Sequence, residues 1–150
     1  MQEKPTNELD EMLSEMKPGD LSDYFKENRK YMADDKKAFY YYFKDVVESK
    51  NIRLADVYSF AGLSESYGSK IVRQEKHAAD RDLIIRLCVA GHLTWDEMNR
   101  ALKLYNMSPL YAKDKRDACL IIAINNRMYD LASIDDLLVS QGHKKLSSIK

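Results

Sequence analysis

The chain has 150 residues and a mass of 17.4 kDa, which suits one compact domain with an appendage and excludes two large domains. Its 24 lysines and arginines balance 24 aspartates and glutamates, so the formal net charge is zero and a histone-like polybasic coat is excluded. A hydrophobic fraction of 45% with 5 glycines and 3 prolines is typical of a folded globular protein. Any nucleic-acid site must therefore be local.

Targeting signals are missing from the sequence pattern. No apolar run approaches the roughly 18 to 20 residues that cross a bilayer, and the N-terminus lacks the positive-then-apolar layout of a secretory signal. The two cysteines, Cys88 and Cys119, lie in separate apolar segments, which indicates buried thiols rather than a disulfide framework. These features predict a cytoplasmic protein with no membrane contact.

The zero net charge hides a gradient. Residues 1–35 hold 5 basic and 10 acidic groups and carry −5, residues 36–104 carry +3, and residues 105–150 carry +2. We expect two short helices in the acidic arm, one that ends at Pro18-Gly19 and one capped by Asp20. Their apolar positions are Leu9, Met12, Leu13 and Met16, then Leu21, Tyr24, Phe25 and Met32. The arm could shield a basic face, mimic a polyanion or simply confer solubility.

Apolar residues recur at helical spacing along the rest of the chain, and no alternating strand pattern is found. The first stripe, Phe39, Phe43, Val46 and Val47, leaves Tyr40 and Tyr41 outside it, as candidates for a subunit contact. The predicted fold class is all-α. The expected helices cover residues 36–50, 54–61, 65–74, 81–91, 95–104, 114–127 and about 133–142.

Capping residues mark several of these boundaries. Thr94 and Glu97 have the spacing of a capping box, in which each side chain satisfies a free N–H of the first helical turn. Ser133 and Asp136 repeat that spacing and predict the start of the last helix. Gly142 would end it, because glycine adopts the left-handed backbone at low cost.

Residues 57–73, VYSFAGLSESYGSKIVR, form the most informative stretch. A short helix, a four-residue turn around Gly62 and a second short helix give the layout of a helix-turn-helix, whose second helix enters the DNA major groove. Gly62 would supply the positive φ of the turn. Ser64 would cap the second helix and leave its N-terminus open to a phosphate or a base edge.

This stretch resembles the phage-repressor type of helix-turn-helix, the Xre or Cro/CI-like group of bacterial transcriptional regulators. The resemblance rests on Ala61, Gly62, Leu63, Ser64, Ser66, Tyr67, Ser69, Ile71 and Arg73, and extends to residues 49–52 and 80–102. It implies a five-helix lambda-repressor-like DNA-binding domain over residues 36–104, behind an acidic helical arm at 1–35. Residues 105–150 resemble the C-terminal extension of a subset of these regulators, carried by Pro109-Leu110-Tyr111, Arg116-Asp117-Ala118, Leu137-Leu138, Gly142 and Leu146. That extension would be a helical pair packed on the domain.

Two positions depart from the family pattern. Tyr58 stands where the family has a small alanine, and Gly68 stands where it has a branched apolar residue. Because the family packs these two sites together, the resemblance implies that Tyr58 fills the space left by Gly68. Glycine within a helix costs about 1 kcal/mol relative to alanine, so a less rigid recognition helix is expected.

The resemblance also assigns the DNA contacts. The residues expected to contact DNA are Ser64, Glu65, Ser66, Ser69, Lys70, Arg73, Lys76 and Arg53. The first five would face base edges, and the other cations would face phosphates. Six basic groups occur between residues 50 and 81, and if about four of them reach phosphate, log affinity falls against log salt with a slope of roughly −4 per protomer. Such weak binding by one copy predicts a homodimer that reads two half-sites.

Other interpretations of the sequence have less support. Phe39 to Phe43, FYYYF, could form a single-strand stacking platform, but it lacks interleaved cations. Cys88 and His92 are four residues apart, yet a structural zinc site needs four ligands, so no metal or cofactor is expected. His77 could contact a phosphate or solvent. Catalytic signatures are missing, so we expect no enzyme.

The alternative function is a protein-interaction module on the same fold. In this alternative, DNA binding is weak or lost, and the acidic arm or the C-terminal helices bind a protein partner, such as a toxin or a signalling enzyme. The small number of side chains able to read bases favours it. The Ser64 cap and the row Lys70, Arg73 and Lys76 favour DNA.

Overall fold

The computed structural model describes residues 13–14, 17–21 and 37–147, and within these ranges it is all-helical, with no strand. From residue 37 onward it contains seven α-helices. Their bounds are α3 (Ala38–Ser49), α4 (Leu54–Phe60), α5 (Glu65–Val72), α6 (Arg81–Ala90), α7 (Trp95–Leu104), α8 (Lys115–Asn125) and α9 (Leu131–Ser140). The predicted all-α class is confirmed for the described residues. None of the helices there is long and apolar enough to cross a bilayer.

The arm predictions fall mostly outside the described residues. These are the helix built on residues 9–16 and the one from Leu21 to Met32. Between them, Pro18–Asp20 form a single 3-10 turn, in which the Asp20 carboxylate accepts a hydrogen bond from the Lys17 backbone N–H at 3.0 Å.

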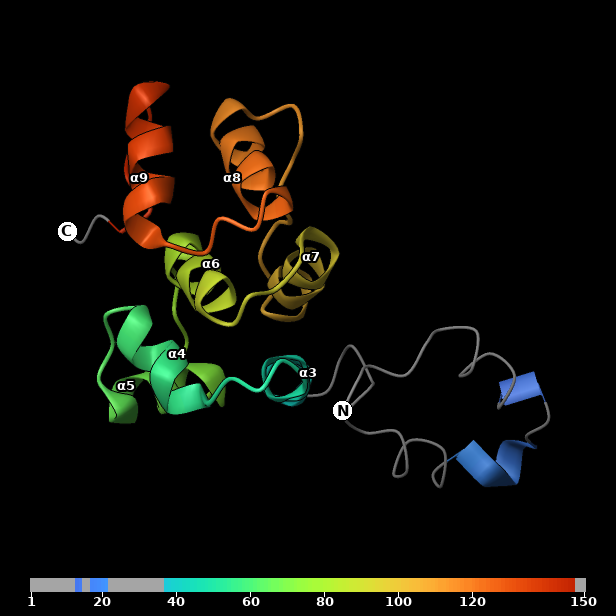
Figure 1. Cartoon of the computed structure of the whole chain (residues 1–150). Coiled ribbons are helices and arrows are strands. Elements are labelled where there is room, and N and C mark those ends of the chain that lie inside the picture. The colour runs from blue at the N-terminus through green and yellow to red at the C-terminus, as the bar shows by residue number, and fades with distance from the viewer. Residues whose placement is uncertain (1–12, 15–16, 22–36, 148–150) are drawn as a thin grey trace.

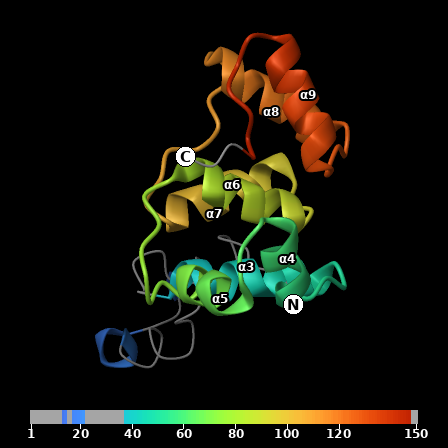
Figure 2. The same cartoon turned by 90° about the vertical axis from the view of Figure 1, so that its left-hand side faces the viewer.

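The body is arranged in three tiers, which both Figure 1 and Figure 2 show. The helices α3, α4 and α5 form one tier, α6 and α7 the middle one, and α8 and α9 the third. One continuous apolar core runs through them, from Phe39 on α3 to Leu146 after α9. Residues Asp82–Ala90 of α6 are all buried, so α6 is the central element on which the other tiers pack.

Helix starts follow the predicted caps, with one correction. Thr94 and Glu97 form the predicted capping box. The last helix, however, begins at Leu131, and the predicted cap at Ser133 is wrong. Asp130 caps the helix, because its carboxylate accepts hydrogen bonds from the Ser133 N–H at 3.2 Å and the Ser133 hydroxyl at 2.7 Å. These bonds lower the pKa of Asp130.

The hairpins α6–α7 and α8–α9 are locally equivalent. The first connector has a left-handed residue at His92 (φ +59°) and the second at Arg127 (φ +56°). In each, the next N–H bonds to the carbonyl five residues earlier: Leu93 to Cys88 at 3.1 Å and Met128 to Ala123 at 2.9 Å. The helices α6 and α8 therefore end in the same left-handed capping arrangement.

The first turns of α6 and α8 are joined reciprocally. Arg81 on α6 forms a two-bond ion pair with Asp117 on α8, and Arg116 on α8 forms one with Asp82 on α6, each with a shortest distance of 2.9 Å. Such exchange of partners is typical of contacts related by a two-fold axis. Ion pairs therefore fix the third tier on the second.

Candidate nucleic-acid interface

The connector between α4 and α5 has the predicted geometry. Gly62 has φ +81°, in the left-handed region that glycine adopts without strain. The Ser64 hydroxyl accepts a hydrogen bond from the Tyr67 N–H at 3.1 Å and caps α5. Ser64 and the first residues of α5, Glu65 and Ser66, are exposed. The N-terminus of α5 is therefore capped and faces solvent.

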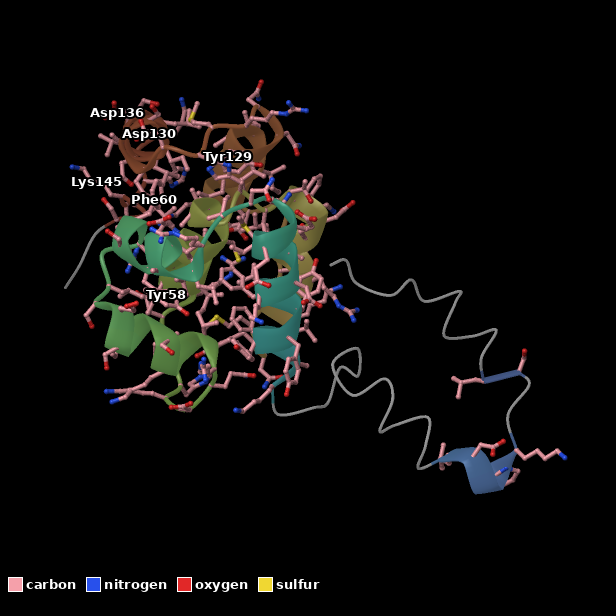
Figure 3. All side chains as sticks on the ribbon, turned by 60° about the horizontal axis from the view of Figure 1, so that its bottom comes forward. Tyr58, Phe60, Tyr129, Asp130, Asp136 and Lys145 are labelled. Carbon is pink, nitrogen blue, oxygen red and sulfur yellow. The ribbon has the colours of Figure 1, made fainter. Side chains whose placement is uncertain are left out.

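Tyr58 on α4 fills the space beside Gly68 on α5, as the resemblance implied. A Cβ added at Gly68 would lie 2.5 Å from the Tyr58 ring carbon Cγ, closer than van der Waals contact permits. Tyr58 is 4% exposed, and Figure 3 places it between the ribbons of α4 and α5. Burial raises the pKa of its phenol, while the nearby Arg73 cation opposes that rise. The large-to-small exchange predicted from sequence is therefore confirmed as a packing contact.

The predicted base-reading residues separate into two groups. Ser64, Glu65, Ser66 and Lys70 are exposed and share the outer side of the connector and α5. Ser69, by contrast, is half-buried, on the side of α5 nearer the body. It is therefore less accessible to a base edge than the other four.

Two of the cations predicted to face phosphates, Arg73 and Lys76, each lie against a tyrosine ring. The Arg73 guanidinium carbon lies 5.2 Å from the Tyr40 ring centroid, and the Lys76 ammonium lies 5.3 Å from that of Tyr67. Both cations are exposed, so each ring orients a charge without neutralising it. Tyr40 is consequently half-buried under Arg73 rather than exposed for a subunit contact, and Tyr41 is half-buried too.

Three of the six cations counted in the sequence are paired within the protein. Arg53 makes two hydrogen bonds of 3.2 Å to Asp56, which raise its pKa. Lys50 pairs with Glu97 at 3.0 Å, and Arg81 pairs with α8 as described above.

The expected number of phosphate contacts therefore falls from about four to three. Within the described part of the chain, Lys70, Arg73 and Lys76 have no carboxylate partner. With three contacts, the expected salt slope becomes roughly −3 per protomer instead of −4.

Tyr105, at the end of α7, fixes the far end of α5. Its side chain is fully buried, and its hydroxyl donates to the Ile71 carbonyl at 3.2 Å and accepts from the Ala78 N–H at 3.1 Å. His77, which sequence reasoning left between phosphate and solvent, is exposed and stacks on the Tyr105 ring at 5.3 Å. Burial raises the pKa of Tyr105. The segment that carries Arg73 and Lys76 is thus anchored to the body.

Comparison with protein-family models, with curated proteins and with solved structures finds no match. The interpretation of this surface therefore depends on its own residues.

Sequence reasoning missed Tyr40, Tyr67 and Tyr105 as supports of the cations. A pair in which an aromatic residue and a cation come from different elements leaves no spacing signal in the sequence. Tyr40 was assigned to a subunit contact instead, and Tyr67 entered only through the family resemblance.

Cys88 and His92 do not lie in one site. Cys88 is fully buried, and burial raises its pKa, whereas His92 is exposed and stacks on Tyr129 at 4.5 Å. Among the described residues, no group of three or more His, Cys, Asp or Glu side chains is placed to hold a metal ion.

Proposed function

We propose that this chain is a sequence-specific DNA-binding transcriptional regulator, with α4 and α5 as its helix-turn-helix and α5 in the major groove. On this proposal, α3 to α7 form a five-helix lambda-repressor-like domain of residues 36–104. The observation that supports it best is the exposed row Lys70, Arg73 and Lys76, which has no carboxylate partner in the described part of the chain. A helix with a capped, open N-terminus and a row of cations along its C-terminal half and beyond suits the phosphates that flank a groove.

The roles of the contacts follow from their exposure. Ser64, Glu65 and Ser66 at the start of α5 face base edges, where Glu65 accepts from cytosine N4 and the serines bond several bases. Lys70, one turn further, reaches guanine O6 and N7 or a phosphate. Arg73 and Lys76 fix the protein on the backbone without reading sequence. Specificity rests on few groups, since Ser69 is half-buried.

A homodimer is part of the proposal. Three phosphate contacts per protomer give weak binding at physiological salt, and two protomers on half-sites one helical turn apart, about 34 Å, double that number. A footprint of two half-sites with about 10 base pairs between their centres would support it, and a single short footprint would count against the dimer.

The proposal is tested by a salt-series titration on genomic fragments. Wild type should show a slope of roughly −3 per protomer, and the double variant Lys70→Ala, Arg73→Ala should lower it to about −1. The control variant, Lys113→Ala with Lys115→Ala, removes two exposed cations at the start of α8 and should leave the slope unchanged. Absent or salt-insensitive binding by the wild type at low salt contradicts the proposal.

A protein-interaction module is the second candidate. It is favoured by the pairing of Lys50, Arg53 and Arg81 with carboxylates of the same chain, which removes half of the cations expected near the groove. If the titration fails while the protein is folded, capture of a partner through the acidic arm or the α8–α9 hairpin is the next experiment.

A further inference from the structure

Arg86 connects two segments that are far apart in the sequence. This α6 residue is 7% exposed, and its Nη1 donates to the Leu146 carbonyl at 3.0 Å. Its Nε lies 3.4 Å from the Ala61 carbonyl, a longer hydrogen bond. Ala61 opens the connector that leads into α5, and Leu146 lies in the segment after α9. One buried guanidinium therefore contacts both the α4–α5 connector and the C-terminal segment.

The C-terminal segment, residues 144–147, is itself held by charged side chains of α8 and α9. The buried Asp135 carboxylate accepts from the Leu146 N–H at 2.7 Å, from the Ser147 N–H at 3.2 Å and from the Ser147 hydroxyl. Arg116 donates to the Lys144 carbonyl at 3.1 Å. The Leu146 side chain is fully buried. The segment is docked by specific bonds rather than by loose contact.

These contacts place the Leu146 peptide between two opposite charges. The peptide unit between Leu146 and Ser147 accepts from Arg86 through the Leu146 carbonyl and donates to Asp135 through the Ser147 N–H, so its dipole bridges a buried cation and a buried anion. Arg86 has no carboxylate partner in the described part of the chain. A buried cation is costly unless it is hydrogen-bonded, so Arg86 depends on the carbonyls of Leu146 and Ala61 to remain buried.

We propose that Arg86 is a positioning residue that couples the docking of residues 144–147 to the placement of α5. While the segment is docked, Arg86 stays buried and its Nε remains against the Ala61 carbonyl, just before the turn that sets the angle of α5. When the segment leaves, Arg86 loses its shorter bond and turns toward solvent, and the Ala61 carbonyl loses its donor. A partner that captured residues 144–147 would thereby weaken ligand binding at α5.

The inference takes its functional meaning from the proposed DNA-binding role of α5, but the coupling itself can be measured without DNA. Amide hydrogen exchange across residues 65–73 of the full chain reports directly on the placement of α5. Arg86→Met removes the guanidinium and keeps the apolar stem, and Asp135→Ala frees the segment from the other side. Each should speed exchange in residues 65–73 by about tenfold, the effect of losing one charge-assisted hydrogen bond.

The two changes act through one connection, so the double variant should exchange hardly faster than either single variant. Arg81→Met is the matched control, because it removes a guanidinium from the same helix. It breaks the ion pair with Asp117 on α8 and the bonds to the Ser108 and Pro109 carbonyls without touching residues 61 or 146. Arg81→Met should speed amide exchange in residues 65–73 no more than it speeds exchange in the rest of the core. Arg86→Lys and Asp135→Asn provide milder variants that should move exchange in the same direction.

Two results would overturn the coupling. In the first, Arg86→Met and Asp135→Ala speed amide exchange in residues 65–73 no more than the Arg81→Met control does. In the second, the effects of the two single variants on exchange add in the double variant. A DNA titration of the same variants separates this result from the proposed function. If wild type does not bind DNA, the proposed function fails, while the exchange data still decide the coupling. If wild type binds, Arg86→Met and Asp135→Ala should each weaken affinity about tenfold and leave the salt slope unchanged, because no phosphate contact is lost.

Discussion

The helix pairs α4–α5 and α6–α7 have connectors of the same geometry, but they lie in different surroundings. Each connector has four residues with a left-handed second residue, Gly62 or His92. Each third residue bonds back five residues, and each fourth residue is a hydroxyl cap, Ser64 or Thr94. The surroundings differ: α6 is buried along nearly its whole length, whereas the outer side of α5 is exposed. A helix-turn-helix layout is therefore a local feature, and tertiary packing decides which pair can meet a ligand.

Different forces act within the first pair and between the second pair and the third tier. Apolar packing of Tyr58 on Gly68 joins α4 to α5, whereas ion pairs join α6 of the second pair to α8. We expect changes to the first contact to act on α5, and changes to the second to act on the whole body.

The largest effect is expected from Tyr58→Ala. Removing a buried aromatic ring should lower the free energy of unfolding by about 3–5 kcal/mol, because a cavity opens beside Gly68. Gly68→Val in the same chain should restore part of the loss by refilling that space, although Gly68→Ala alone should cost about 1–3 kcal/mol by collision with Tyr58. Denaturant unfolding measures each value.

The matched control is Tyr111→Ala, since Tyr111 is 59% exposed and should change stability by less than about 0.5 kcal/mol. Strictly additive costs for Tyr58→Ala and Gly68→Val would contradict the packing exchange.

The next effect concerns the ion pairs and depends on pH. Burial of Asp117 disfavours its charged form, but hydrogen bonds from Arg81 and from the Tyr111 N–H outweigh burial and lower its pKa. A carboxyl whose pKa is lower in the folded state stabilises the protein above its unfolded pKa of about 3.9 and loses that contribution as pH falls through the folded value. Asp117→Asn should therefore cost about 3 kcal/mol at pH 7 and flatten the stability curve below about pH 4.

Urea unfolding between pH 2 and pH 7 checks this expectation. Asp136→Asn, on an exposed residue of α9, should leave both the stability at pH 7 and the shape of the curve close to wild type. An Asp117→Asn curve parallel to wild type in acid would show that the Arg81 pair contributes no pH dependence.

A smaller effect is expected where α7 supports α5. Tyr105→Phe removes the hydroxyl that bonds Ile71 and Ala78. The Ile71 carbonyl keeps its bond from the Gln74 N–H, but the buried Ala78 N–H is left unpaired, at a cost of about 2 kcal/mol. Tyr129→Phe loses one longer bond, 3.3 Å to the Leu93 carbonyl, from a half-buried ring and should cost about 1 kcal/mol or less. Equal losses of stability for the two variants would contradict the specific support of α5 by the Tyr105 hydroxyl.

Local chemistry explains which features sequence could predict. Helix positions followed from apolar spacing, and the turn at Gly62 and the caps at Ser64 and Thr94 followed from side chains that act within three residues. The last helix was misplaced because Ser133 and Asp130 are both capping residues, and only the folded backbone shows that the carboxylate of Asp130 takes the role.

Long-range contacts explain what sequence missed. The charges of Arg53, Lys50 and Arg81 are neutralised by partners 3, 47 and 36 residues away, and only the first of these is a spacing that a sequence pattern can suggest. The dipeptides Arg81-Asp82 and Arg116-Asp117 are alike in sequence, but their exchange of partners requires the fold. The position of the candidate site could therefore be predicted from the sequence, whereas the number of its cations that have no carboxylate partner could not.

The connector itself gives the smallest and sharpest test of the comparison. Gly62 has φ +81°, and a Cβ there would meet no atom within 4 Å, so Gly62→Ala costs only the strain of a left-handed alanine, about 1 kcal/mol. Asn51 holds the equivalent place between α3 and α4 with φ +60°, so Asn51→Gly should relieve strain and raise stability by a few tenths of a kcal/mol. Thermal unfolding of the two variants should shift in opposite directions. If the connectors are equivalent locally, that opposition appears, and shifts of the same sign would mean that the surroundings of Gly62, not its backbone, select glycine there.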